Sequence, residues 1–301
     1  MNGREMSRRE LLAATAGAMA GLTLTVGRPL FGQEKQKEKK QRTPAGFRIG
    51  VCDWTIGKRS DPAALALAKK IGLDGIQVDF GGGPDKDPVL FNAELQGRYA
   101  EEVKAQNMRI ASLALGVLNE VAYKSDPRAE KWVDKAIDVA QAMRQRIILV
   151  AFFSKGDLKN DAAGTSTVVS KLKNIAAKAE KAGVTLGVES WLSAEEHIAL
   201  LDRVGSPAVQ VYYDVANSHK MGYDIYQEIR TLGKRICQFH AKDYDDLYGK
   251  GSIDFKRVRE AMDEIGYRGW FVIEGTKMPK GIEESCRYDA EYLRTIFPRR
   301  V

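Results

Sequence analysis

The sequence contains little cysteine and little histidine. Of its 301 residues, three are cysteines and three are histidines. Cys52, Cys237 and Cys286 are too few and too scattered for a disulfide scaffold or a cysteine zinc motif. No G-x-G-x-x-G segment follows the first apolar run, where a dinucleotide-binding sheet would carry it. The composition, with 44% hydrophobic and 29% charged residues, is that of an ordinary globular protein with a large core.

Most of the chain also lacks an excess of basic charge. The formal net charge is +7, from 47 Lys/Arg and 40 Asp/Glu. Residues 1–42 hold nine of the basic and four of the acidic residues, which leaves 38 basic and 36 acidic residues for the remainder. A folded part with so balanced a charge gives no basis for nucleic-acid binding, and we expect no nucleic-acid partner.

The N-terminus has the pattern of an export signal. Arg8 and Arg9 precede an apolar, Ala/Gly-rich stretch from Leu11 to Val26, which is short for a membrane span. Ser-Arg-Arg followed by Leu-Leu resembles a twin-arginine signal. We therefore expect a signal peptide over residues 1–32, the twin-arginine export machinery as a partner, and a periplasmic or extracellular location. A disordered or membrane-anchoring N-terminus is the alternative.

A charged linker separates this leader from the rest. Residues 33–46, "QEKQKEKKQRTPAG", carry almost no apolar side chains and end in a proline and a glycine. Such a segment buries too little surface to offset its ordering entropy, so we expect a flexible linker. One domain is then expected over residues 47–301.

Short apolar runs alternate eight times with amphipathic segments of helical length. The runs are rich in β-branched and aromatic residues, as strands buried on both faces are. They cover residues 47–54, 75–80, 109–115, 146–153, 185–190, 209–215, 235–243 and 269–275. The helical patterns cover about 61–71, 94–106, 126–144, 165–182, 194–204, 224–233, 254–265 and 282–296. Eight such units over about 250 residues predict an α/β fold, a single-domain (β/α)8 TIM barrel, rather than an open doubly wound sheet.

Ionisable residues end four consecutive runs. They are Glu189, Asp214, His240 and Glu274. Reactive groups of such barrels lie at the C-terminal ends of the strands, so we expect these side chains to converge. Three uncompensated buried carboxylates would cost many kcal/mol, and a divalent cation removes that conflict. The pattern predicts one divalent metal ion, with Mn²⁺ preferred and Mg²⁺, Co²⁺ or Zn²⁺ as alternatives.

The segments "VES", "YYDVAN", "FHAKD" with "GKGSIDF", and "VIEG" resemble the xylose isomerase-like TIM-barrel family of sugar phosphate isomerases and epimerases and ketose 3-epimerases. The resemblance covers about residues 47–297. In the ketose 3-epimerase branch it implies that the four strand-end residues are the metal ligands. It also implies that Glu189 and Glu274 are the catalytic acid/base pair. A substrate contact six residues beyond the first ligand is implied at Glu195, for which a helix-capping role is the alternative.

The sequence departs from the family in its histidines. Asn217 stands three residues after Asp214, where many relatives have a histidine that touches substrate or a second metal. The endonuclease branch needs several histidines for three zinc ions, which the three histidines of this chain cannot supply. We expect His197 to be structural, and His219, which we expect in the loop after the sixth run, near the site, has no assigned role.

Several further residues are candidates for substrate binding. Besides Glu195 and Asn217, Lys242 shares a strand face with His240 and could stabilise an oxyanion or pair with Asp243. Trp54 and Trp191 could stack on a sugar ring or pack at the barrel rim.

These features predict a divalent-metal-dependent sugar isomerase or epimerase. One glutamate would remove a proton next to a carbonyl, giving an ene-diolate, and the other would return it. Since phosphorylated sugars are cytoplasmic, the exported location favours a free or keto sugar or polyol as the carbohydrate substrate. A metal-dependent lyase or hydrolase of keto-glycosides, a dehydratase of the same family, and a non-catalytic sugar-binding barrel are the alternatives. The oligomeric state is open, a homo-oligomer included.

Overall fold

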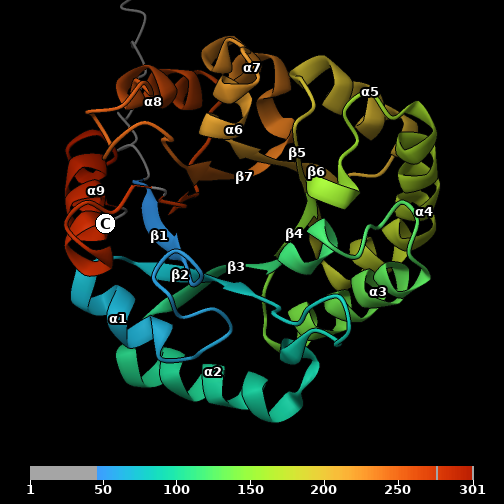
Figure 1. The fold of residues 1–301 in the computed structure, drawn as a ribbon, viewed down its shortest axis with the longest axis horizontal. Helices are drawn as coiled ribbons and strands as arrows, with labels where there is room; N and C mark the ends of the chain where they lie inside the picture. Colours follow the sequence, from blue (N-terminus) through green and yellow to red (C-terminus); the bar gives the residue numbers. More distant parts are fainter. Residues whose placement is uncertain (1–45, 276, 300–301) are drawn as a thin grey trace, which may run out of the picture. The chain divides into compact units, whose positions relative to one another are not determined.

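In the computed structural model, eight parallel strands of the described part of the chain, residues 46–275 and 277–299, close into a barrel. The strands follow one another in sequence order, and β1 pairs with β8 to complete the ring (Figure 1). They are β1 (Arg48–Cys52), β2 (Gly75–Asp79), β3 (Arg109–Leu115), β4 (Ile147–Phe152), β5 (Thr185–Ser190), β6 (Val209–Asp214), β7 (Ile236–Ala241) and β8 (Trp270–Ile273). The predicted (β/α)8 barrel is confirmed. The expected signal peptide and nearly all of the expected linker, residues 1–45, lie outside the described residues.

Helices surround the barrel and connect its strands (Figure 1). They are α1 (Ala64–Ile71), α2 (Ala93–Gln106), α3 (Pro127–Ala142), α4 (Ala162–Ala182), α5 (Ala194–Val204), α6 (Val215–Lys220), α7 (Ile225–Leu232), α8 (Phe255–Glu264) and α9 (Ile282–Ile296). Short 3-10 turns lie at η2 (Val89–Phe91), η3 (Gly116–Asn119), η4 (Ser154–Gly156) and η5 (Gly233–Arg235). The sequence pattern missed α6, because a six-residue helix is too short to show a periodicity.

Polar residues fix the start of several helices. Asp126 accepts a hydrogen bond from the backbone N–H of Arg128, with Pro127 in the first turn of α3. Ser193 and Glu196 form a reciprocal capping box at the start of α5. Because these caps set where each helix begins, they also set the length of the loop between the end of a strand and the next helix.

The core has two layers. Outward-facing strand residues such as Ile49, Val78 and Val188 are fully buried against the helices and join one large apolar cluster. Inside the barrel, smaller clusters of residues fill the space, as in a barrel packed by side chains rather than open as a pore. Inward-facing polar residues are buried among these clusters, and they carry the functional site.

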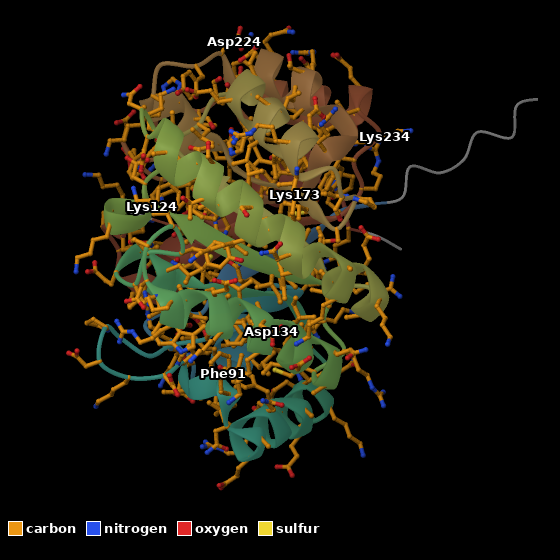
Figure 2. All side chains as sticks on the ribbon, turned by 90° about the vertical axis from the view of Figure 1, so that its right-hand side faces the viewer. Phe91, Lys124, Asp134, Lys173, Asp224 and Lys234 are labelled. Atoms are coloured by element: carbon orange, nitrogen blue, oxygen red, sulfur yellow. The ribbon has the colours of Figure 1, made fainter. Side chains whose placement is uncertain are left out.

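The outer surface is polar. Exposed charged side chains such as Lys173 and Asp224 lie on the outside of the helical ring (Figure 2). Within residues 46–275 and 277–299, no helix combines the length and the apolar character that crossing a membrane requires.

Candidate active site

Four side chains from consecutive strands meet at the C-terminal mouth of the barrel. One ligand atom from each of Glu189, Asp214, His240 and Glu274 lies within 4.8 Å of all the others. His240 Nδ1 is 2.8 Å from Glu189 Oε1, 3.5 Å from Glu274 Oε2 and 3.8 Å from Asp214 Oδ2. The structure thus brings together the four residues that the strand-end pattern singled out.

Each of these side chains is positioned by the end of its strand. Glu189 and His240 are the next-to-last residues of β5 and β7, and Asp214 is the last residue of β6. Glu274 follows β8 directly, and its backbone N–H donates to the carbonyl of Ala241 at the end of β7. Because adjacent parallel strands are hydrogen-bonded in register, as in the pairing of Asp214 with His240, their end residues face one centre.

Asp214 has one oxygen free for a ligand. Its Oδ1 caps α6 by accepting from the backbone N–H groups of Ala216 and Asn217, both at 2.8 Å. Its Oδ2 is buried and has no hydrogen-bond partner among the described residues. Burial raises the pKa of Asp214 to about 7, although the nearby ammonium of Lys242 acts in the opposite direction. A buried, unpartnered carboxylate oxygen that faces three other potential ligands is a strong sign of a cation site.

The charges of the cluster match a divalent cation. Three carboxylates carry three negative charges, and the Lys242 ammonium lies 2.9 Å from Glu274 Oε2 and 3.7 Å from Asp214 Oδ2. With a neutral imidazole the sum is two negative charges, which one divalent ion would cancel. The oxygen-rich donor set with one nitrogen suits Mn²⁺, Mg²⁺ or Co²⁺. The residues present therefore fit a divalent metal, and Glu189, Asp214, His240 and Glu274 would hold it.

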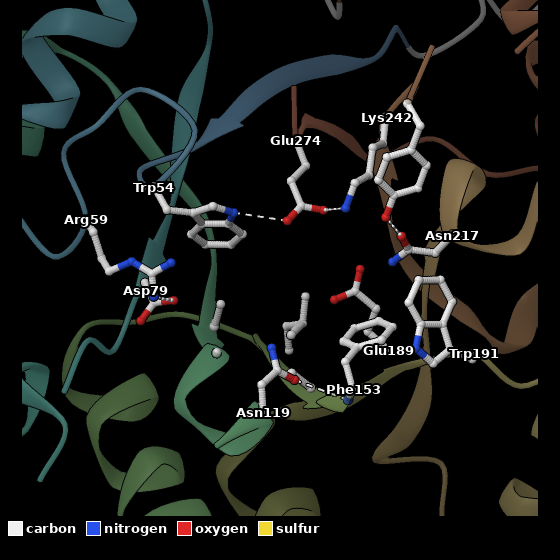
Figure 3. A pocket seen from close by; sticks show the side chains of 15 residues that line it. Trp54, Arg59, Asp79, Asn119, Phe153, Glu189, Trp191, Asn217, Lys242 and Glu274 are labelled. Carbon is white, nitrogen blue, oxygen red and sulfur yellow. Dashed lines mark hydrogen bonds and ion pairs between the residues drawn. The ribbon is translucent and has the colours of Figure 1, made fainter. Parts of the chain in front are cut away.

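Glu274 is held from two sides. Trp54 Nε1 donates to Glu274 Oε1 at 3.0 Å, and Lys242 Nζ donates to Glu274 Oε2 at 2.9 Å (Figure 3). Burial opposes ionisation of Glu274, but Lys242 and then His240 outweigh it and hold its pKa below the usual range. Lys242 therefore pairs with the ligand cluster, and its own pKa is raised because the carboxylates of Glu274 and Asp214 outweigh its burial.

A cavity of about 300 Å³ opens above the cluster. This volume is at the lower end of the range for small-molecule sites. Glu189, Glu274 and Lys242 reach it from the cluster (Figure 3). Its wall is aromatic on several sides and polar between them, from Trp54, Asn119, Phe153, Trp191, Asn217 and Tyr244.

The structure brings most of the candidate substrate contacts to this cavity. Trp54, Trp191, Asn217 and Lys242 all line it. Trp191 packs edge-on against Phe153 with ring centroids 4.9 Å apart, so it contributes both to the rim and to the wall. Asn217 Oδ1 accepts from the Tyr244 hydroxyl at 2.5 Å.

The structure does not bring Glu195 to the cavity. Glu195 is exposed in the first turn of α5, and its carboxylate accepts from the Ser193 hydroxyl at 3.1 Å. Its place beside the capping box agrees with the capping alternative. The capping glutamate itself is Glu196, which also pairs with Lys159 at 2.6 Å.

The other two histidines lie apart from the cluster. His197 is buried in α5, between the carbonyl of Ser193 and the hydroxyl of Ser190, each at 3.0 Å. Burial lowers the pKa of His197 to about 4, so this ring is neutral and structural, as the sequence indicated. His219 lies within α6 rather than in a loop, which corrects the expectation for this segment.

The profile of the family described as "Xylose isomerase-like TIM barrel" matches residues 65–296. The chain belongs to this family. Its relatives include a 2-epi-5-epi-valiolone 7-phosphate 2-epimerase from Actinoplanes sp., 28% identical over 65% of this chain and 72% of the relative. An L-ribulose-5-phosphate 3-epimerase from Escherichia coli is 25% identical over 70% of this chain and 80% of its own length.

Several solved structures share the fold of this xylose isomerase-like barrel. A D-allulose 3-epimerase from Methylomonas sp. superposes with a TM-score of 0.69 at 16% identity, over 84% of this chain and 99% of the other. A 3-keto-D-glucoside 4-epimerase from E. coli gives a TM-score of 0.69 at 14% identity, over 83% and 99%.

Sequence reasoning missed one wall of the cavity in this family member. Arg59 and Asp79 line the side opposite Trp191 and form an ion pair at 3.3 Å (Figure 3). Asp79 ends β2, so the strand-end rule that found the cluster would have found it too. Arg59 lies in an irregular loop, where no periodicity marks a side chain as inward-facing.

Proposed function

We propose that this barrel is a divalent-metal-dependent sugar epimerase or isomerase that removes a proton next to a carbonyl. The observation that carries the proposal is the convergence of three carboxylates and one imidazole on a single point below the cavity. The named relatives support an isomerase-class enzyme with an unspecified substrate. A divalent ion held there would supply Lewis-acid stabilisation of the negative charge that develops on the sugar oxygens.

The two glutamates have the positions that a proton-transfer pair needs. Glu189 and Glu274 come from β5 and from the end of β8, and both line the cavity. A sugar carbon between them would expose one face to each carboxylate, so that one removes the proton and the other returns it. Lys242 and Trp54 would hold Glu274 in place during this exchange.

The charge of the cavity favours an uncharged sugar, keto sugar or polyol. Among the described lining residues, both cations lie beside carboxylates, Arg59 beside Asp79 and Lys242 beside Glu274. A phosphate would therefore have to displace one of these pairs. The relatives compared by sequence are named for sugar phosphates, whereas the solved structures are named for D-allulose and a 3-keto-D-glucoside.

Solvent deuterium exchange tests this proposal. Purified protein loaded with Mn²⁺ would be incubated with ketoses and keto-glycosides in D₂O, followed by NMR analysis of the sugar carbons after removal of the metal. We expect deuterium next to the carbonyl with the wild type, and loss of exchange for Glu189→Gln and Glu274→Gln. Glu195→Gln, exposed outside the cavity, is the matched control and keeps the exchange. If sugars bind but none of them takes up deuterium, the protein would instead be a non-catalytic sugar-binding barrel.

The product distinguishes the competing chemistries. An epimer or an isomer supports the proposal, whereas release of the aglycone from a keto-glycoside would favour the lyase or hydrolase alternative. Each active ketose would also be compared with its phosphate ester. Lys220 lies over the rings of Trp191 and Tyr244 at 5.8 and 4.8 Å. A preference for the ester that Lys220→Met abolishes would contradict the uncharged substrate.

We further propose that the protein is exported by the twin-arginine machinery, on the sequence pattern around Arg8 and Arg9. The test is cell fractionation of the full chain beside an Arg8→Lys/Arg9→Lys variant in a bacterium with this pathway. We expect the wild type outside the cytoplasm and the variant inside it. Equal distribution of the two chains would contradict the proposal.

A further inference from the structure

A glutamine from the opposite side of the barrel holds the imidazole of the ligand cluster. Gln77 lies in the middle of β2, buried and two residues before Asp79, so both side chains face the barrel interior. The ring atom His240 Nε2 is 2.7 Å from Gln77 Oε1. The other ring nitrogen, Nδ1, faces Glu189 and the centre of the cluster.

A buried network sets the orientation of the Gln77 amide. Its Nε2 donates to Ser112 Oγ at 3.0 Å and to the Tyr212 hydroxyl at 3.1 Å, and these residues come from β3 and β6. The Cys52 thiol donates to Gln77 Oε1 at 3.3 Å. In this orientation the amide nitrogen donates to the two hydroxyls, and the carbonyl oxygen, which accepts from the Cys52 thiol, is the atom that faces His240.

A carbonyl oxygen can only accept, which decides the proton on the facing nitrogen. His240 Nε2 must therefore carry hydrogen and donate it to Gln77 Oε1. The remaining nitrogen also faces an acceptor, Glu189 Oε1 at 2.8 Å, to which it donates when no cation is bound; a cation among the carboxylates would replace this proton and use the lone pair of the nitrogen. That nitrogen, Nδ1, is the one that lies beside the three carboxylates.

We propose that Gln77 is a positioning residue that fixes the tautomer of His240, so that Nδ1 is the atom that ligates the metal. This inference rests on the proposed metal site and deepens it. Residues that hold the second nitrogen of a metal-ligating histidine change metal affinity by 10- to 100-fold when they are replaced. Neither the family resemblance nor the strand-end pattern pointed to Gln77, which never contacts the cavity.

His197 provides an internal reference for the test. Its Nδ1 lies 3.0 Å from the backbone carbonyl of Ser193, which can only accept, so His197 has the opposite tautomer, with hydrogen on Nδ1. With three histidines in the sequence, their ring signals can be assigned by replacing His197 and His219 one at a time.

The first experiment is nitrogen NMR of the histidine rings in the full chain labelled with ¹⁵N-histidine and loaded with diamagnetic Zn²⁺ or Mg²⁺. We expect His240 with hydrogen on Nε2 and a metal-shifted Nδ1, and His197 with hydrogen on Nδ1. His240 with hydrogen on Nδ1, or with a metal-shifted Nε2, would overturn the inference. The tautomer is read from the wild type, and the His197 and His219 variants serve only to assign its signals.

The second experiment measures Mn²⁺ affinity by competition with a chelator. Gln77→Met removes the acceptor at similar volume, and we expect the affinity to fall by about 10- to 100-fold. Gln238→Met is the matched control, because it makes the same substitution in the same buried network, where Gln238 Nε2 donates to Ser112 Oγ and the Tyr212 hydroxyl at 2.9 Å and leaves the contact of Gln77 with His240 in place; it should bind Mn²⁺ as the wild type does. Equal losses in the two variants would show that the effect belongs to packing and would overturn the positioning role.

Metal binding by the wild type and by Gln77→Met separates failure of the metal site from failure of the role of Gln77. A wild type that binds no divalent ion removes the proposed function and this inference together. A wild type that binds Mn²⁺, with Gln77→Met binding equally well, removes only the role of Gln77.

Discussion

Two neighbouring residues at the mouth of the barrel, Asp53 and Trp54, hold other groups of the site by hydrogen bonds. Trp54 donates to the carboxylate of Glu274 rather than only lining the cavity. Asp53, the preceding residue, accepts from the backbone N–H groups of Ser60 and Asp79 through Oδ2, while its buried Oδ1 has no hydrogen-bond partner within the part of the chain that the structure describes. Trp54 thus orients Glu274, and Asp53 holds the backbone of Ser60 and Asp79 beside the cavity.

Trp54→Phe should lower kcat with little change in KM. Phenylalanine keeps an aromatic wall but loses the N–H that holds Glu274 Oε1. Since hydrogen bonds to charged groups contribute about 1.5–3 kcal/mol, we expect a loss of roughly 10- to 100-fold in kcat. Steady-state kinetics on the sugar found by deuterium exchange measure this. An increase in KM with unchanged kcat would indicate that Trp54 acts by stacking on the substrate instead.

Asp53 should make the protein less stable as the pH rises. Burial, and then the nearby Asp79, raise the pKa of Asp53 from 3.8 to about 8. Between these values the unfolded chain loses the proton that the folded chain keeps, so the free energy of unfolding falls by up to about 1.4 kcal/mol per pH unit. Asp53→Asn keeps an acceptor and never ionises, so the difference in unfolding free energy between variant and wild type should grow from pH 4 to pH 8. Urea titrations at several pH values would show this trend, and parallel pH profiles would contradict it.

At the scale of elements, the close approach of strands determines where glycine is required. Gly75 begins β2 beside β1 and β3, at the end of the barrel opposite the cavity. A Cβ there would collide with the carbonyl oxygen of Arg109 and lie 2.8 Å from Trp270 Cη2. Gly97 lies within α2, and beyond its own stretch of helix no heavy atom of the described residues lies within 4 Å of the place where a Cβ would go. A larger residue is therefore excluded by space at Gly75, whereas at Gly97 there is room for a Cβ and only the conformational freedom of the backbone would change.

Gly75→Ala and Gly97→Ala should therefore change stability in opposite directions. Overpacking at Gly75 is expected to lower the free energy of unfolding by about 1–3 kcal/mol. Alanine at Gly97 reduces the backbone entropy lost in forming α2 and should raise it by about 0.5–1 kcal/mol. Urea denaturation of both variants beside the wild type measures the two effects. A destabilised Gly97→Ala chain would mean that α2 is packed more closely than its open surroundings indicate.

For the whole molecule, the ligand cluster links metal binding to the stability of the barrel. Its residues come from four strands, so a cation bound there would connect half of the barrel across its mouth. Without the cation, the buried carboxylates repel one another, which is part of why the pKa of Asp214 is raised. The cluster should therefore lower the free energy of unfolding of the metal-free protein and raise that of the metal-loaded protein.

Mn²⁺ at about 100 times its dissociation constant should raise the free energy of unfolding by about 2.7 kcal/mol. In a domain of this size that corresponds to an increase in Tm of about 5–10 °C. Asp214→Asn should lose most of this increase, and its metal-free form should be at least as stable as the metal-free wild type, because one buried charge is gone. Thermal melts with Mn²⁺ and with a chelator provide the comparison. An increase of equal size in the variant would place the metal elsewhere.

The sequence by itself determined the barrel and the four residues at its centre. Eight alternations of buried runs and amphipathic segments are local patterns, and Glu189, Asp214, His240 and Glu274 follow from the rule that strand ends carry the site. The segments just beyond the strand ends were harder to read from local pattern. Glu195 fitted the family spacing but lies exposed outside the cavity, and the segment of His219 is a helix too short to show a period.

Only the tertiary structure decided which side chains pair with and position one another. Gln77 reads in the sequence as one polar residue within a buried strand, and its contact with His240 arises because the closed barrel places β2 and β7 across a shared interior. The pairing of Lys242 with Glu274 rather than with Asp243, and of Arg59 with Asp79, likewise depends on side-chain directions at the mouth. Periodicity determines which way a residue faces, whereas the register and closure of the sheet determine what it meets there.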